Sequence, residues 1–512
     1  MESASLAQPA AGQGSQPFDK GLKTGAIGYI SNLVISVAST APAYSLAATL
    51  GFVVAVTGMG LQSPAIILIS FVPMLFISMA YKYLNQADPD CGTTFTWVSK
   101  AFGPQTGWMG GWGVITSDVL VMASLAQIAA LYTFHLWYAT PDPSSIGVLA
   151  IGVAWIVVMT WICWVGIELS ARLQQILLTI EVITLGAFAV IALVDVYSGQ
   201  AGAHAIHPAF NWFNPFDISS ISTLGTGVLI GIFIYWGWDS GVAVNEESEN
   251  ASHGPGKAAV ISTVLLLLIY LLVTTASQAY AGPHALVAND GDIFAYLGPQ
   301  VFHKPISLLL IITVLTSASA STQTTILPTA RTSLSMARWG GIPRIFGRVH
   351  PRHKTPDVST IAFGAVSVIW FVIIDILSPN NVLGDSVSAV GFMVCLYYGL
   401  TGFACTWYFR RELTKSARNF WLVGVAPLLG GLSLLAVFVI GMIYYGHQIN
   451  NYSKNILGLG LPDVIAIGLI IIGLILGLIF HFTLPGFYRR KPEVAAPGVL
   501  ERPPVSASPN GS

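Results

Sequence analysis

The chain has 512 residues, of which 54% are hydrophobic and only 9% are charged, and its formal net charge is −1. Soluble proteins carry about 25% charged residues, so this composition excludes an ordinary water-soluble protein. The near-neutral charge also argues against a basic surface for nucleic acid.

Long charge-free runs indicate an all-α polytopic membrane protein. The run 24–81 contains no Asp, Glu, Lys or Arg, and 419–453 is another such run. A helix needs roughly 20 apolar residues to cross a bilayer, and runs of this length provide them. We therefore predict twelve spans, near residues 25–56, 62–83, 106–135, 146–166, 171–196, 222–247, 257–281, 305–330, 357–378, 386–409, 420–446 and 461–484.

The basic residues predict how these spans are oriented. With the N-terminus inside the cell, all but Lys304 and Lys454 of the 22 Lys and Arg residues fall on the cytoplasmic side. Cytoplasmic loops carry an excess of Lys and Arg in membrane proteins. We expect both termini in the cytoplasm and the chain in the plasma (inner) membrane.

The segments outside the spans are short and polar. We predict disordered cytoplasmic tails at 1–24 and 485–512, an external loop at 198–221, and two spans appended to the core at 410–484. No signal peptide is expected before the first span. The four cysteines have no paired spacing, which favours packing over disulfides or metal binding.

The first span carries a break, Ser39-Thr40-Ala41-Pro42-Ala43, halfway along its apolar run. Proline has no N–H and clashes with the preceding turn, so the helix should stop before Pro42. Proline suits the first position of the half-helix that follows. The positive end of that half-helix can offer backbone N–H groups to a substrate carboxylate. The candidates on this segment are Ser39, Thr40, Ala43, Tyr44 and Ser45.

The sixth span carries a second break around Gly237. Broken backbone at membrane depth is tolerated where it lines a cavity, and two interrupted spans at matching places in two halves mark the substrate site of many transporters. These halves would be the repeats 25–197 and 222–409. Carbonyl groups around 234–237 can accept from an ammonium group, and a Trp ring offers a cation–π face. The candidates here are Tyr235, Trp236, Gly237, Trp238 and Asp239. Asp239 can bind an amine or cap the next half-helix, and capping is the favoured interpretation.

Four stretches resemble the amino acid–polyamine–organocation permeases. Residues 233–239 with 245–250 are similar to the sixth-helix signature of that family. Residues 89–104 and 331–356 resemble its loops after the second and eighth helices, and 166–172 resembles the entry to its fifth helix. The resemblance implies a leucine-transporter-type fold of five plus five inverted spans, with two more appended. It also implies transport of amino acids or amines. Many members have a Gly-Ser-Gly-like step at the first break, where this chain has 40–42, so polyamines or other amines gain weight as substrates.

Glu181 lies deep inside the fifth span, beyond Arg172. Intramembrane acids are costly and are generally paired, hydrated or protonated. The resemblance places Glu181 where some proton-coupled members carry a lysine between spans one, five and eight. We predict that Glu181 carries the coupling proton. The alternative is a neutral glutamate bonded to a neighbouring carbonyl group.

Three further features accompany this site. Asp118, in the third span, is a possible cavity acid for cationic substrates or an inner gate partner. Four hydroxyl residues of the eighth span fall where sodium-coupled relatives supply ligands, although helix packing is the favoured interpretation: Ser317, Ser319, Ser321 and Thr322. The acids Glu246, Glu247 and Glu249 face the basic loops at 331–354 and 410–418, either as an ionic inner gate or as a solvated surface.

These observations favour a secondary active transporter of amino acids or related amines, coupled to protons and working by alternating access. Its partners would be a small-molecule substrate, the proton and the lipid bilayer, with no cofactor and no metal. An amine permease and an exchanger remain open, and an inorganic cation carrier is less favoured because aromatic residues flank the sixth break. No HExxH, GxSxG or P-loop motif supports an enzyme.

Overall fold

A computed structural model describes residues 20–137, 142–379, 381–447 and 455–501. Within these ranges the regular structure is helical, and the β-pairing consists of isolated bridges. The helices are α1 (Tyr29–Thr40), α2 (Pro42–Ala55), α3 (Ser63–Ala87), α4 (Thr94–Phe102), α5 (Pro104–His135), α6 (Ile146–Val165), α7 (Ile167–Ser198), η1 (Phe210–Phe213), η2 (Pro215–Asp217), α8 (Ile221–Tyr235), α9 (Ser240–Ala243), η3 (Asn245–Glu247), α10 (Gly254–Ala288), α11 (Ile293–Val301), α12 (Ser307–Trp339), η4 (Arg344–Gly347), α13 (Asp357–Leu377), α14 (Val382–Tyr408), η5 (Leu413–Lys415), α15 (Ala417–Asn419), the π-helical η6 (Phe420–Val425), α16 (Ala426–Gly446), α17 (Leu461–Thr483), α18 (Pro485–Tyr488) and η8 (Val499–Glu501).

The prediction of an all-α polytopic membrane protein is confirmed. In the described part of the chain, 11 helical stretches are long and apolar enough to cross a membrane. The sixth predicted span forms the shorter helix α8 followed by α9 and η3. Every predicted span therefore coincides with helix, while the count of twelve and the inverted repeat remain predictions.

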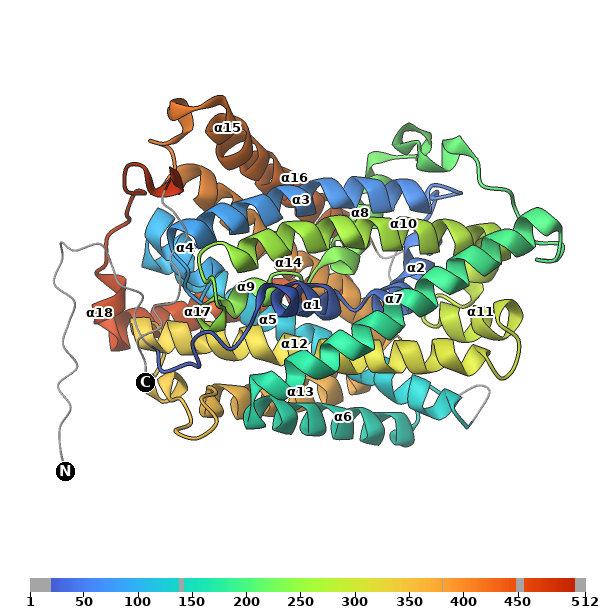
Figure 1. Cartoon of the computed structure of the whole chain (residues 1–512), viewed down its shortest axis with the longest axis horizontal. Helices are drawn as coiled ribbons and strands as arrows, with labels where there is room; N and C mark the ends of the chain where they lie inside the picture. The colour runs from blue at the N-terminus through green and yellow to red at the C-terminus, as the bar shows by residue number, and fades with distance from the viewer. Residues whose placement is uncertain (1–19, 138–141, 380, 448–454, 502–512) are drawn as a thin grey trace.

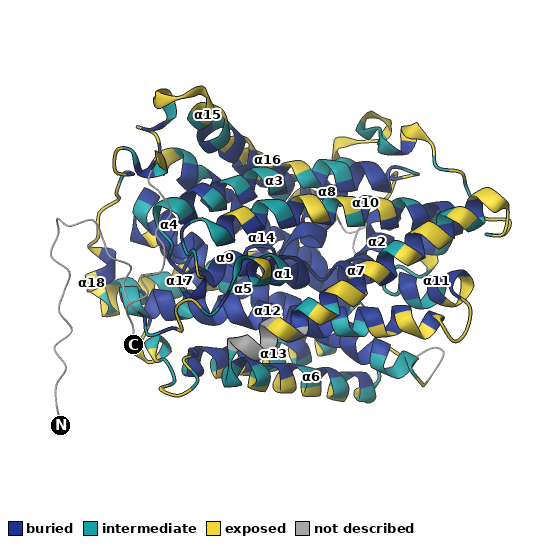
Figure 2. Cartoon of the chain, viewed as in Figure 1, coloured by how far each residue is buried: buried dark blue, intermediate teal, exposed yellow. Residues whose placement is uncertain are grey.

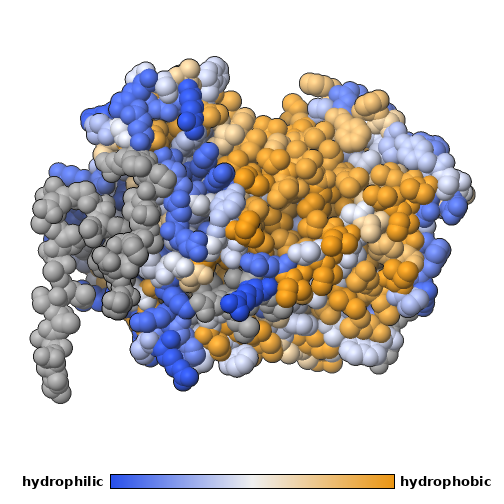
Figure 3. Space-filling model, in the orientation of Figure 1, coloured by the Kyte–Doolittle hydropathy of each residue, from blue (hydrophilic) through white to orange (hydrophobic). Residues whose placement is uncertain are grey.

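The long helices lie side by side along the long axis of the molecule (Figure 1). Helices α4 and α18 lie at one end, and α11 and the loop after α7 lie at the other. Apolar residues cover the middle of the visible surface, whereas hydrophilic residues gather at the end that carries α4 and α18 (Figure 3). This distribution is the one that a bilayer around the middle of the helices requires.

The interrupted first span lies at the centre of the bundle. In Tyr29–Ala55 and in Pro104–His135, 89% of the most apolar 18-residue stretch is buried inside the protein. In Leu461–Thr483 the buried share of that stretch is 17%. Figure 2 shows the same contrast between the inner helices and the exposed outer faces of α6 and α7. The appended α17 thus lies at the periphery, and the two breaks are enclosed by protein.

The predicted disordered tails are wrong where the structure describes them. Lys20 is buried, and the backbone N–H groups of Glu493 and Ala495 donate to the carbonyl groups of Lys100 (2.6 Å) and Tyr408 (3.0 Å). Backbone hydrogen bonds to α4 and α14 hold the C-terminal segment, and ion pairs with Asp90 and Glu246 hold Lys20; composition reveals neither. Residues 1–19 and 502–512 of the predicted tails lie outside the described residues.

Candidate functional site

The first span breaks where the proline predicts. Helix α1 ends at Thr40 and α2 begins at Pro42, with Ala41 between them in the left-handed region at φ 46° and ψ 71°. Pro42 occupies the first position of α2, as expected from its missing N–H. The N-terminal end of α2 therefore lies in the centre of the bundle, and its first backbone N–H groups need partners outside the helix.

These backbone groups are not free, contrary to the prediction. The N–H of Ala43 donates to Oε1 of Glu181 at 2.7 Å, and the N–H of Tyr44 donates to Oγ of Ser317 at 3.3 Å. The N–H of Ser45 bonds to a carbonyl group of the preceding turn. A helix N-terminus attracts an anion, and here the carboxyl group of Glu181 occupies that position.

Glu181 links three spans. It extends from α7, contacts Ala43 of α2, and accepts a second hydrogen bond from the Ser317 hydroxyl of α12 at 2.7 Å. Its side chain is buried, and the ion pairs found among the described residues do not include it. The structure thus places Glu181 between spans one, five and eight, where the family resemblance puts it.

The break in the sixth span lies directly against the break in the first. Helix α8 ends at Tyr235 and α9 begins at Ser240, and between them Gly237 adopts φ +119°. A Cβ atom at Gly237 would lie 2.8 Å from the carbonyl oxygen of Ser39. The hydroxyl groups of Ser39 and Ser240 are 2.7 Å apart. Only glycine permits this approach of the two backbones.

The hydroxyl groups and carbonyl groups near the breaks are largely used within the protein. Thr40 Oγ1 donates to the carbonyl oxygen of Val37 (2.6 Å), and Ser45 Oγ donates to that of Thr40 (2.6 Å). The Tyr44 hydroxyl bonds to Ser124 Oγ of α5. The carbonyl group of Gly237, predicted to be free, accepts from the backbone N–H that opens α9 (3.1 Å). A substrate must displace such bonds or use the remaining groups.

Asp239 occupies the N-cap position of α9, but its side chain does not take the favoured capping role. Its carboxylate makes no capping bond to α9 and instead accepts from the hydroxyl group of Tyr397 at 3.1 Å. The indole N–H of Trp236 donates to the same Tyr397 oxygen. The Tyr397 hydroxyl group thus accepts one hydrogen bond from Trp236 and donates another to Asp239. The Asp239 carboxylate is therefore bound by Tyr397 and not by the N-terminus of α9.

Three aromatic rings lie next to Asp239. Trp238 stacks on Tyr398 with ring centroids 5.1 Å apart, and Tyr81 meets Trp238 edge-on at 5.0 Å. The indole N–H of Trp238 is buried and has no hydrogen-bond partner among the described residues. Tyr235, the other predicted aromatic residue, packs edge-on against Tyr270 at 5.1 Å. The cluster of Tyr81, Trp238 and Tyr398 thus supplies π faces and one unused donor beside a carboxylate.

Asp118 forms a further part of the core. It lies on α5, its side chain is buried, and it accepts a hydrogen bond from the Thr329 hydroxyl of α12. Like Glu181 and Asp239, it belongs to none of the ion pairs in the described ranges. Three buried carboxyl groups therefore lie in the spans without a basic partner in that part of the chain.

Sequence reasoning missed Tyr81, Tyr397 and Tyr398 and preferred a packing role for Ser317. The adjacent tyrosines in the middle of the charge-free run 386–409 were a usable signal, because a buried tyrosine hydroxyl usually needs a partner. The bond between Ser317 and Glu181 depends on the packing of α7 against α12, which has no local signature.

One of the acids at the end of the sixth predicted span forms a buried ion pair. Arg331, at the end of the eighth predicted span, binds Glu247 of η3 through Nε (2.5 Å) and Nη2 (2.9 Å). Both side chains are 1% exposed. The two-pronged contact joins the end of the sixth span to the eighth, as an inner gate requires.

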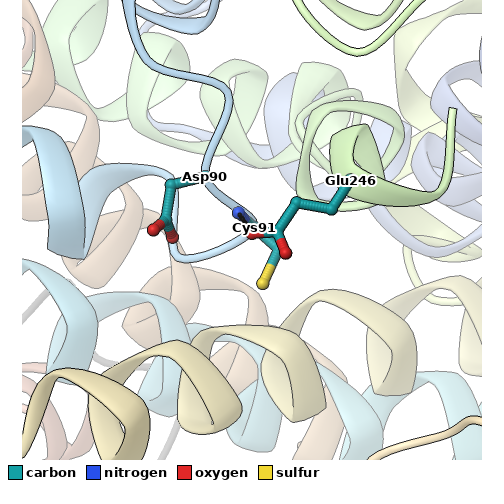
Figure 4. Close-up of side chains that lie close together, drawn as sticks. All are labelled: Asp90, Cys91 and Glu246. Carbon is teal, nitrogen blue, oxygen red and sulfur yellow. Dashed lines mark hydrogen bonds between the residues drawn. The ribbon is translucent and has the colours of Figure 1, made fainter. Parts of the chain in front are cut away.

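The partner of Glu246 was not predicted. The Nζ atom of Lys20 lies 2.5 Å from Oε1 of Glu246, 2.9 Å from Oδ1 of Asp90 and 3.5 Å from Sγ of Cys91. Figure 4 shows Asp90 and Cys91 on the segment between α3 and α4, with Glu246 reaching towards Cys91 from η3. Their ligand atoms lie within 4.8 Å of one another, a spacing that can hold a cation, and the Lys20 ammonium occupies this position.

Burial and charge act against each other in this cluster. Burial opposes the charge of Lys20, but the carboxylates of Asp90 and Glu246 outweigh it and raise its pKa well above the usual value. Burial likewise raises the pKa of Asp90, but the Lys20 ammonium and the hydrogen bonds from Ser335 and Gly92 bring it well below its usual range. Lys20 and Asp90 thus form an ionised, buried pair.

Comparison with known proteins agrees with this geometry. The amino acid permease family model matches residues 27–482. The chain is 24% identical over 444 residues to the arginine/ornithine antiporter of Latilactobacillus sakei, covering 81% of this chain and 90% of that protein. It is 22% identical to the low-affinity putrescine importer PlaP of Escherichia coli K12 (72% and 79% covered) and 22% identical to the branched-chain amino acid permease BcaP of Lactococcus lactis (71% and 78% covered). The chain therefore belongs to the amino acid permease family of the amino acid–polyamine–organocation superfamily.

Proposed function

We propose that this protein carries amino acids or related amines across the plasma membrane by alternating access, with proton coupling through Glu181 and both termini in the cytoplasm. The family and the transported compounds named for its relatives support the substrate class. The two facing breaks support a central binding site. The bond between Glu181 and the N-terminus of α2 is the observation that carries the coupling.

The coupling follows from competition for one helix end. An ionised Glu181 occupies the Ala43 N–H, which a substrate carboxylate would also use. Protonation removes the charge of Glu181 and weakens its hold on α2, so the N–H becomes available to the substrate. Substrate and proton then load together, and release of the proton restores the bond between Glu181 and Ala43.

The first prediction concerns Glu181→Gln in proteoliposomes. Glutamine keeps an oxygen for the Ala43 N–H and the Ser317 hydroxyl but cannot carry a proton. We expect an inward proton gradient to drive accumulation of substrate by the wild type but not by Glu181→Gln, which should retain exchange. The measurement is sodium-free uptake of labelled arginine, ornithine, leucine and putrescine, with exposed Glu493→Gln as the matched control.

Three other results would contradict the proposal. Accumulation by Glu181→Gln at the wild-type level would remove the proton role of Glu181. Wild-type uptake that ignores the gradient but needs internal substrate would identify an exchanger. Failure to take up any organic solute would favour the inorganic cation carrier.

A preference for cationic amines is the second candidate, and Asp239 carries it. This buried carboxylate lacks an ion-pair partner in the described chain and lies beside Trp238, whose ring can bind a cation. Asp118 adds a second negative group in the core. A buried carboxylate without a counter-charge is stabilised by a proton or by a cationic ligand.

The second prediction is that Asp239→Asn raises the KM for arginine or putrescine and leaves leucine nearly unchanged. A hydrogen bond to a charged group contributes about 1.5–3 kcal/mol, which corresponds to roughly 10–100-fold in affinity. The measurement is concentration-dependent uptake of all three compounds. Asp217→Asn in the exposed external loop is the control for the same chemical change. An equal loss for leucine would show that Asp239 acts without regard to substrate charge.

A further inference from the structure

The segment 20–28 crosses the cytoplasmic end of the sixth span. The N–H of Ile27 donates to the carbonyl oxygen of Glu247, and the N–H of Glu249 donates to that of Ile27, both at 3.0 Å. These two bonds form a short bridge between the segment before α1 and the residues after η3. The segment is therefore attached to the span whose end forms the inner gate.

Lys20, at the start of this segment, reaches the other side of the gate. Its carbonyl oxygen accepts from Nη2 of Arg338 on α12 at 3.3 Å. Its ammonium group binds Asp90, which also accepts hydrogen bonds from Ser335 (2.7 Å) and Trp339 (3.2 Å) of α12. One residue thus connects the end of the sixth span, through Glu246, with the end of the eighth.

The Lys20 ammonium also separates two acids. Asp90 and Glu246 approach the same nitrogen at 2.9 and 2.5 Å. Without Lys20 these carboxylates would face each other in a buried place, and each would lack its counter-charge. Removing one member of a buried ionic cluster is costly because the remaining charges stay desolvated. Loss of Lys20 should therefore destabilise the closed arrangement of the gate more than loss of a solvent-exposed ion pair would.

We propose that Lys20 is a gating residue of the transport cycle, and that the segment 20–28 is a latch that must leave the Asp90–Cys91–Glu246 cluster when the cytoplasmic side opens. This inference rests on the proposed alternating access and orientation, but it does not depend on which substrate or coupling ion the protein uses. It concerns an ion pair separate from the one between Arg331 and Glu247, and it assigns a mechanical role to a segment that lies before the first span.

Cys91 provides a reporter at the centre of this contact. Its thiol is fully buried, 3.5 Å from the Lys20 ammonium, and burial raises its pKa well above the usual value. A thiol in this state reacts slowly until it is exposed. The chain's other cysteines are Cys163, Cys395 and Cys405, all buried, and they can be replaced by alanine to leave Cys91 alone.

The third prediction is that loss of Lys20 exposes Cys91. The measurement is the rate at which N-ethylmaleimide labels Cys91 in inside-out vesicles. Lys20→Met should label about tenfold faster than the wild type because the latch no longer holds the gate closed. Lys20→Arg keeps the charge and should stay near the wild-type rate. Lys354→Met, an equal charge change in an exposed cytoplasmic loop, should leave the rate unchanged.

A parallel chain that retains only Cys395 tests whether the fold survives. Cys395 is buried within α14 and should remain unlabelled in Lys20→Met. Labelling of Cys395 as fast as that of Cys91 would mean general loosening and would overturn the proposal. Wild-type labelling of Cys91 in Lys20→Met, or equally fast labelling in Lys20→Arg, would also overturn it.

Discussion

Replacing Gly237 by alanine is expected to abolish transport while the protein still inserts into the membrane. The new Cβ would lie 2.8 Å from the oxygen and 2.9 Å from the carbon of the Ser39 carbonyl group, and 3.0 Å from the Thr40 nitrogen. All three atoms belong to backbone, so no side-chain rotation relieves the clash. Alanine at φ +119° is also strained, by about 1–3 kcal/mol. The two breaks would separate, and the proposed binding site between them would be lost.

Two measurements test this fourth prediction. Uptake by proteoliposomes reports transport, and the yield of monodisperse protein reports whether the variant still folds. Gly468→Ala on α17 is the matched control, because a Cβ at that position meets no atom within 4 Å. We expect Gly468→Ala to transport normally and Gly237→Ala to remain at background. Normal uptake by Gly237→Ala would show that the close approach of the two breaks is not needed for transport.

Breaking the ion pair between Arg331 and Glu247 is expected to destabilise the protein strongly. Arg331→Met leaves a buried carboxylate and Glu247→Gln leaves a buried guanidinium group, and each single loss of this kind costs about 3–5 kcal/mol. Arg331 also donates to the carbonyl oxygen of Leu327 at 3.2 Å, a bond that methionine cannot replace. The double variant has no buried charge left without a partner. Its free energy of unfolding should therefore fall by less than the sum of the decreases in the two single variants.

Thermal unfolding of the purified variants in detergent, arranged as a double-mutant cycle, measures this fifth prediction. The exposed Arg352 offers the control substitution Arg352→Met, which removes a cytoplasmic positive charge without disturbing a buried partner. Additive losses in the cycle would show that Arg331 and Glu247 do not act as a pair. Transport should fall with stability, because the same contact closes the cytoplasmic side.

Features with a local cause were predictable from the sequence. Pro42 cannot continue the helix before it, so the break at Ala41 appears at the expected residue. Charge-free runs predicted the helices, since the apolar length that a bilayer needs is visible in any window. Opposite charges at the ends of two predicted spans indicated the contact between Glu247 and Arg331 as one of two alternatives, the other being a solvated surface.

Features that depend on distant packing were not predictable. Glu181 meets Ala43 across 138 positions of sequence, and their bond removes the N–H that the local pattern presents as free. Asp239 has the residue type of a cap, but Tyr397 binds its carboxylate from another helix. Lys20 belongs to a stretch with the composition of a disordered tail, but Asp90 and Glu246 bind its ammonium group and Arg338 binds its carbonyl oxygen. In each case a partner far along the chain outweighs the local preference.

The measurement that tests proton coupling through Glu181 most directly is the internal pH of proteoliposomes containing a trapped pH-sensitive dye. With no imposed gradient, addition of the transported amino acid or amine outside should acidify the interior of wild-type vesicles. Glu181→Gln vesicles should show no acidification, and Glu493→Gln vesicles should behave like the wild type. Substrate uptake by the wild type at constant internal pH, or acidification that persists in Glu181→Gln, would contradict the account.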